Sequence, residues 1–156
     1  MQFLDATIQV IAGMLGTLGF GILFNVRRKK LFFGCIGSII SWSMYLLLKL
    51  FIPSEILIYL LVSITTSIYS EILAAALKTP TTTFLIISLI PLIPGGSLYY
   101  ALSHAFEGNN VEFLTRALYT LQLASALSLG IILVLSFTKS VKKLHKTSSS
   151  KNTIEE

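Results

Sequence analysis

Long apolar runs alternate with short polar clusters along this chain. A hydrocarbon core of about 30 Å is crossed by about 20 apolar residues in a helix, and five runs reach that length. They cover residues 3–24, 31–52, 54–77, 81–106 and 113–137. Helices satisfy their backbone hydrogen bonds internally within a bilayer. The pattern therefore predicts an all-α membrane protein with five transmembrane helices, followed by a polar tail at residues 139–156.

The fourth run is interrupted near its centre by Pro91, Pro94, Gly95 and Gly96. Proline removes a backbone donor and clashes with the preceding turn, and glycine in a helix costs about 1 kcal/mol relative to alanine. In hydrocarbon, freed backbone groups persist only where they are buried in protein or line a cavity. We therefore predict a fourth span that is broken near the middle of the membrane, with the break marking a site. A proline kink without a ligand is the alternative.

The composition and the charge pattern agree with a membrane protein. Of the 156 residues, 54% are hydrophobic and 12% are charged. All but two of the 12 basic residues lie on one side of the predicted membrane, at residues 27–30, at Lys78 and in the tail. Since basic connections stay in the cytoplasm, an external N-terminus and a cytoplasmic C-terminus are expected. These basic residues lack interleaved aromatic residues, which favours contact with membrane lipid over nucleic-acid binding.

Small residues recur at the spacing of closely packed helices. The spaced sets are Gly13, Thr17 and Gly21; Gly34 with Ser38; Gly37 with Ser41; and Ala126 with Gly130. In lipid, such faces let helix backbones approach closely. Packing within the chain and contact with another subunit both explain them. Because five helices form a thin bundle around any internal pathway, we expect a partner chain or a homo-oligomer.

Glu71 is the only acidic residue well inside a predicted span. It lies about 10 Å from the helix end marked by Lys78. Ser63, Ser67 and Ala74 share its helix face, which suits a pathway lining or a tight helix contact. Two interpretations of Glu71 stay open. It either binds and releases a proton as substrate moves, or it pairs structurally with Lys78 or with a cation of a partner chain.

The break offers a complementary feature. A half-helix that begins at Gly95-Gly96-Ser97 has free N–H groups and a positive dipole end that can hold a carboxylate. Secondary transporters use broken helices in this way. The predicted substrate-binding residues are Pro91, Pro94, Gly95, Gly96 and Ser97. Glu71 is the candidate for proton coupling, and Ser63, Ser67 and Ala74 are the candidates for pathway lining.

Several chemical classes are not expected. The two histidines and the single cysteine are too scattered for a metal cluster. The chain has no GxxxxGK[ST] loop for a nucleotide, and no nucleophile–base pair is expected at membrane depth. We therefore predict no metal, no cofactor and no enzymatic activity.

Several stretches together resemble one family. They are Glu71-Ile72-Leu73-Ala74, Lys78-Thr79-Pro80, Pro91-Leu92-Ile93-Pro94-Gly95-Gly96 with Tyr99, and Gly19-Phe20-Gly21-Ile22-Leu23-Phe24-Asn25. This set is similar to the small-subunit half of the threonine/serine exporter family, over about residues 8–137. The Pro-Leu-Ile-Pro-Gly stretch is its most specific element.

The resemblance implies a secondary transporter of the cell (plasma or inner) membrane that exports small carboxylate-bearing metabolites. These are threonine and serine, or dicarboxylates such as succinate in split versions, where a larger membrane subunit carries the complementary half. Glu71, Pro91, Pro94 and Gly95 match the family motif. The lysine-rich tail matches no part of it, so no transport role is expected there. A non-transporting membrane scaffold or assembly subunit is the alternative function.

Overall fold

The computed structural model describes residues 2–26 and 28–152, and all regular elements in those ranges are helical. They are α1 (Gln2–Leu23), α2 (Arg28–Lys49), α3 (Glu55–Ala76), α4 (Thr81–Leu89), the short 3-10 helix η1 (Ile90–Leu92), α5 (Gly95–Phe106) and α6 (Asn110–Asn152). By length and composition, 4 helices of the described residues can cross a membrane, or 5 if the bent pair of α4–η1 and α5, which meet at 57°, counts as one span. The predicted all-α class is confirmed, and the predicted five spans with a broken fourth correspond to the upper count.

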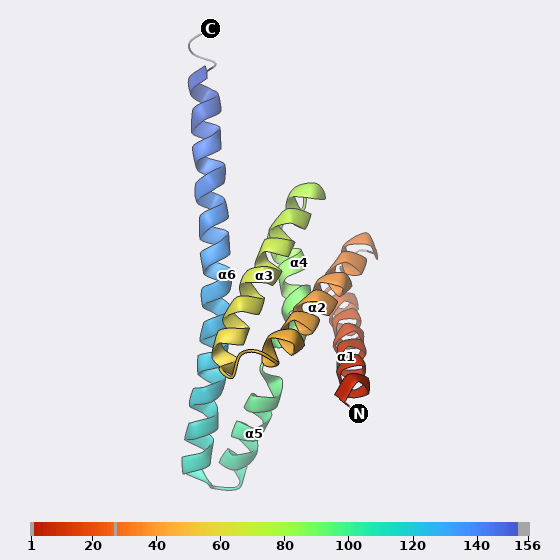
Figure 1. The fold of residues 1–156 in the computed structure, drawn as a ribbon, viewed down its shortest axis with the longest axis vertical. Helices are drawn as coiled ribbons and strands as arrows, with labels where there is room; N and C mark the ends of the chain where they lie inside the picture. Colours follow the sequence, from red (N-terminus) through yellow and green to blue (C-terminus); the bar gives the residue numbers. More distant parts are fainter. Residues whose placement is uncertain (1, 27, 153–156) are drawn as a thin grey trace.

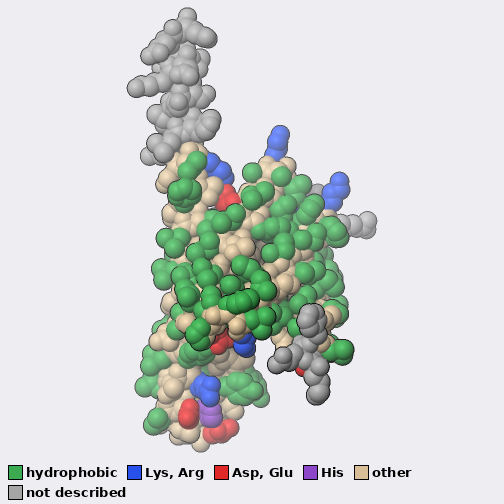
Figure 2. Space-filling model, in the orientation of Figure 1, with side chains coloured by type: hydrophobic (Ala, Val, Ile, Leu, Met, Phe, Trp, Pro, Cys, Tyr) green, Lys and Arg blue, Asp and Glu red, His purple; other side chains and the backbone are tan. Residues whose placement is uncertain are grey.

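α1, α2 and α3 alternate in direction, α4 and α5 together run back, and α6 returns, so the other connections gather at two ends of the bundle (Figure 1). One end, here the basic end, holds the α1–α2 and α3–α4 connections with Lys30, Lys78 and, on α6, Lys142. The opposite, acidic end holds the N-terminus and the α2–α3 and α5–α6 connections, with Glu55 and Glu107. Figure 2 shows the charged side chains gathered toward the two ends, with hydrophobic side chains between them. Which end faces the cytoplasm stays a prediction.

Helix α6 continues well beyond its predicted span. It contains 43 residues and ends at Asn152, whereas the apolar run predicts an end near Phe137. At 1.5 Å per residue its length is about 65 Å, and its C-terminal part extends past the other helices (Figure 1). Arg27 and residues 153–156 lie outside the described part of the chain, as do the side chains of Arg28, Lys143, Lys146 and Lys151.

The small residues of α2 and α6 pack within the chain. A Cβ atom at Gly37 would overlap the Ser88 hydroxyl of α4 and lie 2.7 Å from the Tyr69 ring. The Ser41 hydroxyl donates to the Ser88 carbonyl over 2.8 Å, at the same crossing of α2 and α4. Gly130 of α6 lies equally close to α3. These two faces are therefore contacts within one protomer, the first of the two predicted explanations.

A carboxylate at the acidic end joins three helices. The Tyr45 hydroxyl of α2 donates to Glu55 Oε1 of α3 over 2.6 Å, and the Tyr119 hydroxyl of α6 donates to Glu55 Oε2. Directly beside them, Tyr45 and Tyr59 belong to the buried core cluster, which also contains Leu92 of η1. The arrangement fixes the start of α3 and the N-terminal part of α6 relative to α2.

Replacing Tyr119 with phenylalanine should lower the stability of the protein by about 1.5–3 kcal/mol, because a hydrogen bond to a charged group is lost. Thermal unfolding in detergent measures this change. Tyr100→Phe is the matched control, since Tyr100 lies exposed on α5 and has ring contact with Tyr99. Equal unfolding midpoints for the two variants would show that the Glu55 contact does not stabilise the fold.

Candidate functional site

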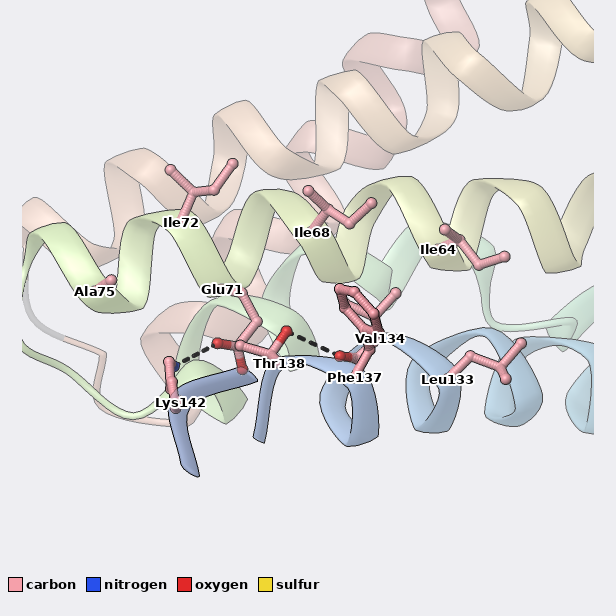
Figure 3. Close-up of a pocket in the computed structure, with 10 residues that line it drawn as sticks. All are labelled: Ile64, Ile68, Glu71, Ile72, Ala75, Leu133, Val134, Phe137, Thr138 and Lys142. Atoms are coloured by element: carbon pink, nitrogen blue, oxygen red, sulfur yellow. Dashed lines mark hydrogen bonds and ion pairs between the residues drawn. The ribbon is translucent and has the colours of Figure 1, made fainter. Parts of the chain in front are cut away.

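Glu71 has two partners near the basic end. Its Oε2 atom lies 2.9 Å from the Lys142 ammonium of α6 (Figure 3). Its Oε1 atom accepts a 2.8 Å hydrogen bond from the Thr81 hydroxyl. The Glu71 side chain is 13% exposed and that of Lys142 is 63% exposed. Thr81 is the first residue of α4, so the carboxylate also lies near the positive dipole end of that helix. A buried acid is thus held between three helices.

The cation beside Glu71 differs from the one expected. Lys78 lies four residues after Ala74. It is exposed and makes no ion pair within the described ranges. Lys142 takes that place, although it lies 71 residues away in the sequence, in the tail for which no transport role was expected. Glu71 is therefore paired with a cation, as one of the two interpretations expected. The partner is Lys142, which the spacing of residues around Glu71 did not indicate.

Glu71 and Lys142 lie at one end of a groove between α3 and α6. The groove has a volume of about 720 Å³ and apolar walls that include Ile64, Ile68 and Phe137. Figure 3 shows Thr138 beside the ion pair, with its hydroxyl donating to the Val134 carbonyl over 2.9 Å. Glu71 thus lies beside apolar side chains on one side and beside the exposed Lys142 on the other.

The predicted pathway face of α3 is a helix contact in this protomer. Ser63, Ser67 and Ala74 are buried and line none of the pockets found in the described residues. The Ser63 hydroxyl donates to the Leu60 carbonyl over 2.8 Å and lies against Gly130 of α6. Of the two roles that the sequence allowed for this face, the geometry shows the tight contact.

The break starts α5 at the predicted residue. Gly95 is the first residue of α5, and its N–H donates to the Ile93 carbonyl over 2.6 Å. The Leu98 N–H returns to the Pro94 carbonyl over 3.1 Å. The N–H groups of Gly96 and Ser97 between them have no hydrogen-bond partner in the part of the chain that the structure describes, as expected for a first helical turn. Nothing lies within 4 Å of a Cβ atom built at Gly95 or Gly96. Gly95 and Gly96 are exposed and Ser97 is half-buried, so the two unpaired donors lie at an exposed helix start.

Pro91 has a packing role next to these donors. It lies in η1, and its ring carbons are 3.4 and 3.5 Å from a Cβ atom built at Gly13 of α1. Gly13 therefore allows α1 to approach the break closely. Pro94 precedes α5 as its N-cap and makes no side-chain cap hydrogen bond.

The break and Glu71 lie near opposite ends of α3. Leu92, immediately before the break, packs with Ile58 and Tyr59 in the first turn of α3. Glu71 lies 13 residues after Ile58, which corresponds to about 20 Å along the helix. Relative to α2 and α3 the break is thus close to the acidic end, whereas the same core cluster joins Leu92 to Leu123 and Ala126, near the centre of the predicted fifth span. The depth of the break in the membrane stays a prediction. None of the three pockets that adjoin Glu71, the α1–α2 connection and Cys35 is lined by both features.

The described ranges contain no group of three His, Cys, Asp or Glu side chains that could hold a metal ion. The chain matches the family model described as Threonine/Serine exporter, ThrE, over residues 9–137. No curated protein and no solved structure gives a significant match. The matched region includes Glu71, the break and most of the five spans. This multi-pass membrane protein therefore belongs to the threonine/serine exporter family.

Proposed function

We propose that the protein is a subunit of a secondary transporter that exports threonine, serine or a dicarboxylate such as succinate across the cell membrane. The family supports export as the activity. The observation that supports a carboxylate-bearing substrate is the pair of open N–H groups at Gly96 and Ser97. Adjacent N–H groups at a helix start, with the positive end of the helix dipole, favour a carboxylate. Substrate crosses the membrane chemically unchanged, so the proposal requires no enzymatic step.

We infer that a larger membrane subunit with the complementary half of the exporter covers the start of α5. Only 11% of the α1 span and 17% of the α6 span are buried against the rest of this chain. Open backbone donors are unfavourable in hydrocarbon and need a protein or water-filled surrounding. A partner that packs on α1 and α5 supplies that surrounding and closes a cavity over Gly95 and Gly96. A homo-oligomer is the competing arrangement, and cross-linking with mass determination distinguishes the two.

Helix α4 offers a physical connection between Glu71 and the break. Thr81, at its first turn, donates to Glu71, and its other end continues through η1 to Pro91. Proton uptake by Glu71 removes the attraction to Lys142 and changes the contact with Thr81. We propose that Glu71 couples proton movement to export through α4, which moves the packing of Pro91 on Gly13.

Leucine in place of Gly95 should reduce export at least about tenfold, a change equal to ~1.4 kcal/mol, because its side chain fills the space beside the open donors. Release of labelled threonine, serine and succinate from preloaded cells measures the effect. Gly16→Leu is the matched control, since a Cβ atom at Gly16 of α1 also meets nothing within 4 Å. Both variants are therefore expected to fold, and co-purification with the partner subunit checks that the proposed contact on α1 is kept in each. Full export by the Gly95 variant would exclude the start of α5 as the substrate site.

The substrate class itself is tested by the intracellular pools of threonine, serine and succinate in cells with and without the protein and its partner. Accumulation of at least one of them in the absence of the protein supports the proposed function. Unchanged pools of all three would contradict it and favour the non-transporting scaffold.

A further inference from the structure

A second pocket lies at the basic end, between the α1–α2 connection and the start of α4. Its volume is about 460 Å³, and its polar lining residues are Asn25, Lys30, Thr82 and Thr83. Phe24 and Ile86 are among its apolar lining residues. The pocket shares the first turn of α4 with Glu71, since Thr81 contacts Glu71 while the next two residues line the pocket.

The polar groups of this pocket are unused. Threonine hydroxyls inside the helices of this chain donate to the carbonyl four residues earlier, as Thr17 and Thr66 do over 2.8 Å. Thr82 and Thr83 stand in the first turn of α4, where no helical carbonyl precedes them, and neither hydroxyl has a partner among the described residues. Lys30 likewise has no carboxylate within ion-pair distance in the described part of the chain. One ammonium and two hydroxyl donors are therefore available to a ligand.

This donor set suits a single carboxylate of a small metabolite. A lysine ammonium gives a strong charge-assisted hydrogen bond to a carboxylate, and hydroxyl donors can satisfy its remaining lone pairs. The volume lies within the usual range of small-molecule sites, about 300–1,000 Å³. Apolar neighbours such as Ile86 can contact a short carbon chain. The phosphate of an anionic lipid offers similar oxygens, but it belongs to a headgroup with two long acyl chains.

We propose that Lys30, Thr82 and Thr83 form a second substrate site, which binds the carboxylate of the exported metabolite at the basic end before it reaches the break. The proposal rests on the proposed export function and on the predicted cytoplasmic position of the basic end. An exporter takes up its substrate from the cytoplasm, so a carboxylate site at that end is where recognition begins. Binding there changes the surroundings of the α4 first turn, whose other side contacts Glu71.

Equilibrium binding of labelled succinate and labelled threonine to the purified full chain in phosphatidylcholine nanodiscs tests this site directly. Lys30→Gln should weaken the binding of at least one of them by at least about tenfold, as expected for the loss of a hydrogen bond to a charged group. Lys29→Gln is the matched control, because Lys29 carries the same charge, is exposed and does not line the pocket. Thr83→Val should weaken binding less, with Thr79→Val as its control, since the Thr79 hydroxyl already donates to the Leu77 carbonyl.

Selective loss of binding in the Lys30 variant, together with failure of succinamide or threonine amide to compete, supports the carboxylate site. Equal effects of the Lys29 and Lys30 substitutions, or no binding to the unaltered chain, would overturn it. Phosphatidylglycerol in the nanodisc could instead displace both metabolites, while excess free metabolite fails to displace the lipid. That result would identify a lipid site and would also overturn the proposed carboxylate site. A selective loss of binding in a protein whose deletion leaves all three metabolite pools unchanged would retain the site and contradict the export function instead.

Discussion

Substitution of glutamine for Glu71 is expected to reduce export by at least about tenfold, equal to ~1.4 kcal/mol, while the protein still folds and assembles. Glutamine retains the shape of the side chain and can still accept the hydrogen bond from Thr81, but it can neither release a proton nor attract Lys142 as a carboxylate does. The comparison of export rates with the amount of assembled protein in the membrane therefore isolates the ionisable group.

Lys142 supplies the control that separates proton coupling from structural pairing. In the proton-coupling interpretation, Lys142→Gln leaves substantial export, because the exposed lysine only modulates the acid. The reversed pair, Glu71→Lys with Lys142→Glu, then fails to restore export, since no acid remains at position 71. Equal losses in the Glu71 and Lys142 variants, with recovery in the reversed pair, would instead identify the contact as a structural ion pair and contradict the coupling role.

Alanine in place of Gly130 is expected to destabilise the protein by about 1–3 kcal/mol, the usual effect of overpacking a close contact. A Cβ atom there would overlap the Ser63 hydroxyl and lie 2.9 Å from the Leu60 carbonyl oxygen. The hydroxyl can rotate away, but the carbonyl belongs to the backbone of α3, so the two helices must separate. Leucine at the same position should prevent accumulation of folded protein. Thermal unfolding of the alanine variant and membrane yield of the leucine variant measure these effects.

Gly16→Ala serves as the reference for this test. Gly16 lies on α1 with no neighbour within 4 Å of the added atom, and alanine is the better helix former by about 1 kcal/mol. The reference variant should therefore be as stable as the unaltered protein or slightly more stable. If the Gly130 and Gly16 variants unfold at the same temperature, the close approach of α3 and α6 is not required for stability.

Features that depend on local chain properties were accessible from the sequence. The number of spans follows from the length of each apolar run, and the break follows from Pro91, Pro94 and the two glycines, which cannot continue a regular helix. The start of α5 at Gly95 was correct for the same reason. The glycine and serine spacing of α2 correctly indicated a tight crossing, although it did not identify α4 as the partner helix.

The tertiary structure alone decided which distant residues meet. Lys142 reaches Glu71 only because α6 continues as a helix beyond its apolar run and lies against α3, and Tyr119 reaches Glu55 through the same contact. The position of the break along α3 depends on how α4 and η1 pack against that helix. This packing places the break and Glu71 near opposite ends of α3. Helix formation is governed by near neighbours in the sequence, whereas the rotation and relative height of packed helices depend on side-chain contacts across the whole bundle. The sequence by itself therefore determined the spans, the break and the family resemblance, and the packing of those spans decided the surroundings of each candidate site residue.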